Sequence, residues 1–138
     1  MTYTTEQDMI DRFGNDELLQ LTDRNNTGAI DTTVLDDAIA DAGNEIDSYL
    51  GGRYTLPLST VPPVLNRVCA DIARYRLYTF EAPTEVANRY KANTQWLTQV
   101  ANGVIQLGVD AVGAQPADAV TPPNPPARVF TYDTLKDY

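Results

Sequence analysis

The sequence predicts a mainly α-helical protein: a small bundle of about four helices, two of them long, with a short β segment that forms an arm at the C-terminus. Three observations predict this fold class. Apolar residues recur at three- and four-residue steps through the middle of the chain, Gly and Pro mark the ends of those stretches, and strand-like alternation occurs near the C-terminus. A length of 138 residues suits one hydrophobic core.

Two short helices are expected first. One begins at Thr4 or Thr5 and ends at Gly14, which suits a left-handed cap. Asn15 then caps a second short segment over residues 15–22, and the acidic first turn of that segment favours the positive end of a helix.

A long helix of about 19 residues is expected next, with Asp31 as its N-cap and Gly51 after its last turn. One face of this helix is apolar and is formed by Leu35, Ala38, Ile39, Ala42, Ile46 and Tyr49. The opposite face is polar and is expected to meet water; it carries Asp36, Asp37, Asp41, Asn44, Asp47 and Ser48.

A proline-containing connector separates this helix from the next one, which begins near Pro63 and runs through Phe80. Arg76 projects from the apolar stripe of this helix, so we expect it to meet a carboxylate or to extend toward water. Its opposite side mixes apolar and charged residues, which is typical of a helix packed on both sides. The stripe itself consists of Leu65, Val68, Cys69, Ile72 and Tyr75.

The last long helix starts around Pro83 and ends at Gly103, and Trp96 lies beside its core face rather than at the centre. We therefore assign residues 1–103 to a helical domain and residues 104–138 to a Pro-rich linker followed by a β arm.

Within the C-terminal part, residues 104–112 have the pattern of a short strand. The stretch "RVFTYDTL" alternates in the way of a strand, with Phe130 and Tyr132 on one side. Two alternatives stay open for this arm: it adds a strand to another chain, or it folds back onto its own subunit.

The composition argues against an enzyme. The chain has no histidine, so the commonest general base and metal ligand is missing, and the single Cys69 has no imidazole to activate it. We expect no catalytic residue, cofactor or metal. No apolar run approaches the length of a membrane span, and the polar N-terminus does not resemble a signal peptide, so folding in a cytoplasm is expected.

The net charge of −9 is unevenly distributed. Residues 1–52 carry twelve Asp or Glu and two Arg, residues 53–97 carry three acids and six bases, and residues 98–138 carry four acids and two bases. Such acidity argues against a protein that grips a nucleic acid backbone. Either the acids form a solvated surface, or the acidic first part of one copy packs against the basic middle of the next.

The stretch "DRNNTGAID" resembles the start of an EF-hand calcium loop over residues 23–34. Position 12 of that loop is Val34 instead of the bidentate Glu, which leaves the calcium shell incomplete. The same letters suit a helix start, with Asp31 as the cap and Gly28 in a positive-φ turn. We favour the helix start and keep a calcium-binding regulatory module as an alternative. The EF-hand positions that do match are Asp23, Asn25, Thr27, Gly28, Ile30 and Asp31.

The stretch "RYRLY" mixes bases and aromatic residues as nucleic-acid surfaces do. On a helix, however, Arg74 and Arg76 point in different directions, and Asp71 lies between Arg67 and Tyr75. A packed helix with ion pairs is the better interpretation. Cys69 lies in the apolar stripe and is expected in the core.

Four stretches stand out as long, ordered strings: "LTDRNNTGAID" from Leu21, "EIDSYLGGRYTLPL" from Glu45, "VPPVLNRVCADIARYRLY" from Val61 and the C-terminal "RVFTYDTL". Together they resemble one protein family, the head–tail adaptor proteins of Mu-like phages and prophages. The resemblance covers nearly the whole chain apart from the Pro-rich linker.

The resemblance implies a structural virion protein, a connector or head-completion adaptor that joins the DNA-filled capsid to the tail. The implied partners are other copies of the chain in a ring, twelvefold to match a portal, the portal protein itself, and a tail-proximal adaptor or terminator protein. DNA would pass through the lumen without specific binding, and no membrane is involved. The expected location is the virion, after synthesis in the bacterial host cytoplasm. A tail-completion protein is an alternative role in the same particle.

We predict a subunit interface from helical geometry and charge, and not from the family. The basic side consists of Arg67, Arg74, Tyr78 and Trp96, and the acidic side of the next copy consists of Asp36, Asp37, Asp41 and Asp47. Phe130 and Tyr132 are expected to anchor the arm.

Overall fold

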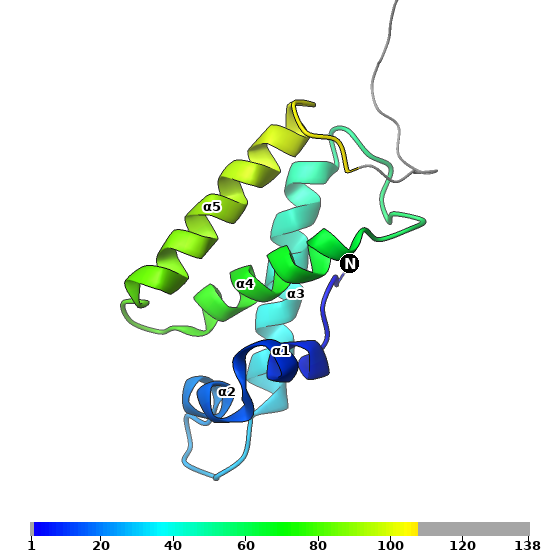
Figure 1. The fold of residues 1–138 in the computed structure, drawn as a ribbon. Coiled ribbons are helices and arrows are strands. Elements are labelled where there is room, and N and C mark those ends of the chain that lie inside the picture. The colour runs from blue at the N-terminus through cyan, green and yellow to red at the C-terminus, as the bar shows by residue number, and fades with distance from the viewer. Residues whose placement is uncertain (1, 108–138) are drawn as a thin grey trace, which may run out of the picture.

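The computed structural model describes residues 2–107, and in this range the chain forms five α-helices and no strand (Figure 1). The helices are α1 (Glu6–Phe13), α2 (Asn15–Thr22), α3 (Thr32–Leu50), α4 (Pro63–Leu77) and α5 (Thr84–Ala101). The mainly helical fold class is confirmed. The Pro-rich linker and the predicted arm with Phe130 and Tyr132 lie outside the described residues.

The first helix begins and ends as its sequence predicts. Thr5 is the N-cap of α1: its hydroxyl accepts a hydrogen bond from the Asp8 amide, and the Asp8 carboxylate accepts one from the Thr5 amide. Gly14 ends α1 with a φ of +92°, a conformation that favours glycine. The chain turns there and enters α2 directly.

Helix α3 starts at a well-defined cap and is joined to the end of α2. The Asp31 carboxylate accepts hydrogen bonds from the amides of Thr33 at 3.0 Å and Val34 at 3.3 Å, which confirms it as the N-cap. The buried hydroxyl of Thr22 accepts a hydrogen bond from the Asp31 amide at 3.0 Å and donates one to the Leu18 carbonyl at 2.8 Å. The end of α2 and the start of α3 are therefore held together.

The core lies where α3, α4 and α5 meet. Helix α4 crosses in front of α3 in Figure 1, α5 packs against both, and α1 and α2 cover the N-terminal end of α3. Burying each large apolar side chain contributes about 1.5 to 3 kcal/mol. The core side chains come from every helix and include Met9, Leu18, Leu35, Ile46, Leu50, Leu65, Ile72 and Leu97.

Helix α4 is shorter than predicted. It ends at Leu77 instead of Phe80, because Tyr78 is extended, with φ −74° and ψ 123°. The four residues that follow turn the chain so that α5 can run back beside α4, and Pro83 then precedes the first residue of α5. The side chain of Phe80 in this turn is 79% exposed.

Residues 104–107, at the start of the predicted linker, contact the helical core. Ile105 and Leu107 pack against it, and the Leu107 amide donates a hydrogen bond to the Tyr54 hydroxyl at 3.2 Å. The part of the predicted strand over residues 104–112 that the structure describes has no strand conformation. The division into two segments at residue 103 stays a prediction. Over residues 2–107, no helix combines the length and the apolar character that a bilayer crossing requires.

Candidate subunit interface

A cavity of about 480 Å³ opens between α1, α4 and α5. We call it the arginine pocket, because three arginines and one aspartate lie in its wall. The three helices contribute, in order, Arg12 and Phe13, then Arg67 and Asp71, then Arg89, Ala92 and Asn93. The lining itself holds three positive charges and one negative charge, and Glu85 beside Arg89 and Asp8 near Arg12 offset part of this excess from outside the lining.

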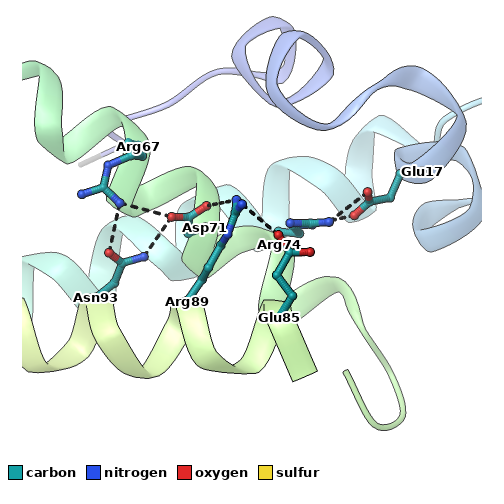
Figure 2. Close-up of polar contacts among 7 residues, drawn as sticks. All are labelled: Glu17, Arg67, Asp71, Arg74, Glu85, Arg89 and Asn93. Atoms are coloured by element: carbon teal, nitrogen blue, oxygen red, sulfur yellow. Dashed lines mark hydrogen bonds and ion pairs between the residues drawn. The ribbon is translucent and has the colours of Figure 1, made fainter. Parts of the chain in front are cut away.

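Asp71 lines the pocket, and Arg67, Arg89 and Asn93 all contact its carboxylate (Figure 2). Its side chain is buried, and its Oδ2 accepts hydrogen bonds from Asn93 Nδ2 at 3.0 Å and from Arg67 Nη1 at 3.4 Å. Arg67 Nη1 also donates to Asn93 Oδ1 at 3.3 Å, and Arg89 Nη1 lies 3.9 Å from Asp71 Oδ1. Arg67 and Asp71 share one face of α4 because they are four residues apart.

The arginines of the pocket keep much of their surface in contact with solvent. The side chains of Arg67 and Arg89 are 49% and 50% exposed. Arg89 also pairs with Glu85 through Nη2 at 2.8 Å. A guanidinium has five N–H donors, and these contacts engage one nitrogen of Arg67 and two of Arg89. Donors therefore remain for an incoming anion.

Arg12 is held at the rim by a chain of side-chain hydrogen bonds. Arg12 Nη2 donates to Asn66 Oδ1 at 2.7 Å, and Asn66 Nδ2 donates to Asp8 Oδ2 at 2.8 Å. The hydrogen bond from Asn66 is the main cause that lowers the pKa of Asp8, and the nearby charge of Arg12 contributes. Asp8 therefore stays ionised and helps to hold α1 against α4.

A second arginine of α4 is engaged inside the subunit. Arg74 binds Glu17 of α2 through two hydrogen bonds, Nε to Oε2 at 2.6 Å and Nη2 to Oε1 at 3.1 Å, and its Cζ lies 4.5 Å from the centre of the Phe13 ring. Burial alone would lower the pKa of Arg74, but the hydrogen bond and charge of Glu17 outweigh it and raise the pKa. We call this contact the Glu17–Arg74 pair.

Arg76 meets a carboxylate, as its position in the apolar stripe predicted. It binds Glu45 of α3, with its Nε 3.1 Å from Oε1, and the Tyr90 hydroxyl donates to Oε2 of the same carboxylate at 2.9 Å. Burial, together with the bond to Glu45, raises the pKa of Tyr90 to about 12. The Tyr90 ring stacks on Tyr75 with 4.1 Å between centroids. These contacts join α3, α4 and α5.

Three of the four predicted interface carboxylates are exposed on α3. Asp36, Asp37 and Asp41 are exposed, and α3 contains no Lys or Arg, so we call this surface the acidic α3 face. Asp47 is partly buried and accepts a hydrogen bond from the Tyr3 hydroxyl. Burial and this hydrogen bond raise the pKa of Tyr3. Asp47 therefore ties the N-terminal segment to α3.

The predicted basic side is divided among several places. Of its four residues only Arg67 lines the arginine pocket; Arg74 is paired with Glu17, Tyr78 is partly buried just after α4, and Trp96 packs against the core. Their roles between copies stay predictions. Phe130 and Tyr132 lie outside the described residues.

The predicted interface included only one of the three arginines of the pocket and missed the other two, Arg12 and Arg89. Arg12 lies in the strongly acidic first part of the chain, where a regional charge count hides it. Arg89 follows Glu85 by four residues, a spacing that suggests a local ion pair on the surface of a helix. Only the tertiary arrangement of α1, α4 and α5 shows that both line the same pocket as Arg67.

In the loop that resembles the start of an EF-hand, the carboxylate of Asp23 accepts hydrogen bonds from backbone amides of the loop and so stabilises a turn. Asp23 accepts hydrogen bonds from the amides of Thr27 and Gly28, both at 2.7 Å, and these bonds lower the pKa of Asp23. Gly28 has a φ of +84°. The interpretation as a helix start is therefore supported at Asp23, Gly28 and the Asp31 cap. Over residues 2–107, no three His, Cys, Asp or Glu side chains form a group that could hold a metal ion.

Cys69 lies in the core, as its place in the stripe predicted. Its side chain is buried, and burial raises the pKa of its thiol to about 11. A buried, protonated thiol is a poor nucleophile.

Comparison with known proteins identifies relatives of this chain. A family model described as Bacteriophage Mu, Gp36 matches residues 3–122. The Mu-like prophage FluMu protein gp36 of Haemophilus influenzae is 39% identical over 107 residues, which cover 78% of this chain and 76% of that protein. Gene product J of Escherichia phage Mu is 34% identical over 112 residues, which cover 80% of this chain and 79% of that protein.

Proposed function

This chain belongs to the Bacteriophage Mu Gp36 family, and from that premise we propose that it is a structural virion protein, a head–tail connector that docks on the portal as a ring. In this role it joins the DNA-filled capsid to the tail. Its partners are further copies of itself, the portal protein and a tail-proximal adaptor or terminator protein.

The observation that carries the proposal is that one subunit has two unlike surfaces of opposite charge. The arginine pocket lies between α1, α4 and α5, and the acidic α3 face lies on the exposed side of a helix whose buried side packs on α4 and α5. Two different surfaces that bind each other form a heterologous interface, which closes into a ring when the rotation between copies allows it. A connector ring requires such surfaces.

The charge of the chain also suits a channel for DNA. The net charge is −9, so a ring of such subunits repels phosphates as a whole, and DNA passes through without being retained.

The proposal is tested by removing the protein from phage production. We expect filled heads and separate tails that do not join, and addition of purified protein should restore joined particles. Particles that keep their tails without this chain would contradict the proposal. Tails of abnormal length beside heads that remain competent to join would indicate the tail-completion role instead.

Electron microscopy supplies the second part of the test. Purified protein mixed with the portal should give annular density at one end of the portal, and the same protein mixed with tails alone should not. Density found only on tails would place the chain on the other side of the junction and contradict portal docking.

A further inference from the structure

We propose that the arginine pocket is a carboxylate-binding site that receives Asp37 from the acidic α3 face of a second copy of this chain. The proposal rests on the proposed function, because it names the contact by which neighbouring copies in the ring recognise each other. It assigns the basic side to Arg12, Arg67 and Arg89.

The chemistry of the pocket selects an anion. Arg67 and Arg89 are half-exposed, and their guanidinium groups are only partly engaged by Asp71, Asn93 and Glu85, so N–H donors remain for a further carboxylate. Guanidinium groups bind carboxylates through paired N–H donors in a fixed geometry. A cavity of about 480 Å³ is large enough for an aspartate side chain.

The pocket is also built before any partner arrives. Asp71 and Asn93 are buried and hold Arg67, and Asn66 holds Arg12 at 2.7 Å. Arginine side chains normally lose rotamer freedom when they bind, and side chains that are already held lose less. Exposed arginines held by buried polar groups are therefore suited to docking.

Charge complementarity identifies the occupant as the acidic α3 face. Asp37 lies on the exposed side of α3, in the N-terminal third of the helix, and the exposed residues that follow it on that side include the small residues Ala40 and Asn44. Small side chains allow another surface to approach closely. A DNA phosphate is a poorer candidate, because the subunit carries a net charge of −9 and would repel the rest of the duplex.

The occupant must come from another copy. The apolar side of α3 packs on α4 and α5, which line the pocket, so Asp37 on the opposite side of α3 points away from the pocket of its own subunit. Asp37 of one copy can meet the pocket of the next copy only in a head-to-tail arrangement.

A charge exchange between two variants tests this pairing. The pocket variant carries Arg67→Glu and Arg89→Glu, and the face variant carries Asp37→Arg and Asp41→Arg. Self-association is measured by sedimentation equilibrium at low salt up to the highest soluble concentration. For each variant alone, the association constant should be at least about tenfold lower than that of the wild type. An equal mixture should regain association, because each reversed surface then meets a reversed partner.

A matched control separates the pocket from net charge. The variant with Arg24→Glu and Lys91→Glu makes the same change of charge at two exposed positions outside the pocket and should associate as the wild type does. Circular dichroism and cooperative unfolding check that each variant folds; a pocket variant that fails to fold is replaced by Arg67→Gln with Arg89→Gln, which should also weaken association.

Four results would overturn the proposal. They are a wild type that stays monomeric throughout, a pocket variant that associates like the control, two weakened variants whose mixture recovers nothing, and a fluorescent DNA duplex that binds the wild type but not the pocket variant. The last result would assign the pocket to phosphate. Failure of the proposed function is seen in a separate experiment, as particles that keep their tails without this chain. That result would not alter the outcome of the sedimentation experiment, which tests the contact between copies on its own.

Discussion

The Glu17–Arg74 pair and the arginine pocket present the same residue type in two different situations. Arg74 and Arg67 lie about two turns apart on α4. The Arg74 side chain is 13% exposed and makes two hydrogen bonds to one carboxylate of its own subunit, whereas the Arg67 side chain is 49% exposed and shares a buried carboxylate with Arg89.

The difference shows that an arginine on a mixed helix face serves either the fold or a partner, according to what the rest of the chain places opposite it. Glu17 comes from α2 and satisfies Arg74 inside the subunit. In the pocket, Arg67 and Arg89 share Asp71 and are engaged through only some of their nitrogens, so N–H donors there remain for another molecule. The same substitution should therefore lower the free energy of unfolding much more at Arg74 than at Arg67.

The largest effect is expected from Arg74→Ala. The change removes two charge-assisted hydrogen bonds and the contact with Phe13, and leaves Glu17 partly buried, so the free energy of unfolding should fall by about 2 kcal/mol. Urea denaturation followed by circular dichroism measures it.

Arg67→Ala is the matched control for that prediction. Because its side chain is half-exposed, its loss should change the free energy of unfolding by less than about 0.5 kcal/mol. Equal losses of stability in the two variants would remove the distinction between the two regions.

A smaller loss of stability is expected from Asp71→Asn. The amide retains an oxygen for Asn93 but removes the charge that Arg67 and Arg89 share, so repulsion between the arginines should lower the free energy of unfolding by about 1 kcal/mol. Measurement in added salt should recover part of this loss, since salt screens the half-exposed arginines. A loss that salt leaves unchanged would indicate a packing effect.

The smallest effect concerns Asp8, which holds Asn66 and thereby Arg12. The folded pKa of Asp8 is below its ordinary value, so its contribution is present above that ordinary value and is lost as the pH falls through the lowered pKa. Screening by solvent keeps the contribution below about 0.5 kcal/mol. The free energy of unfolding of the wild type should therefore decline below about pH 4, and that of the Asp8→Asn variant should decline slightly less over the same pH range. Identical acid profiles would show that Asp8 contributes nothing.

The sequence predicts the helices well where their ends depend on neighbouring residues. The Asp31 carboxylate caps α3 by accepting hydrogen bonds from amides in the first turn of that helix, Gly14 turns the chain with a positive φ, and Pro63 is the first residue of α4. Each of these effects depends only on residues that are close in the sequence. The sequence pattern predicts the end of α4 at Phe80, whereas the helix ends at Leu77. The difference arises because the turn from α4 into α5 depends on how those two helices pack.

The candidate site was predicted less completely, because its contacts join distant parts of the chain. Arg76 was expected to find a carboxylate, and it does, but periodicity could not name Glu45. In the same way, nothing in the local pattern shows that Arg74 forms an ion pair with Glu17, which lies 57 residues earlier in the chain. Charge and spacing identify which side chains need partners, and tertiary packing decides which ones already have them.

The Thr22 hydroxyl, which bonds the Asp31 amide, has a practical consequence for the loop between α2 and α3. It fixes both ends of the loop at one buried point, while residues 24–29 are all exposed. The loop is therefore exposed along its length and fixed at both ends, so a fluorophore or short epitope could be inserted there as a label without disturbing the core.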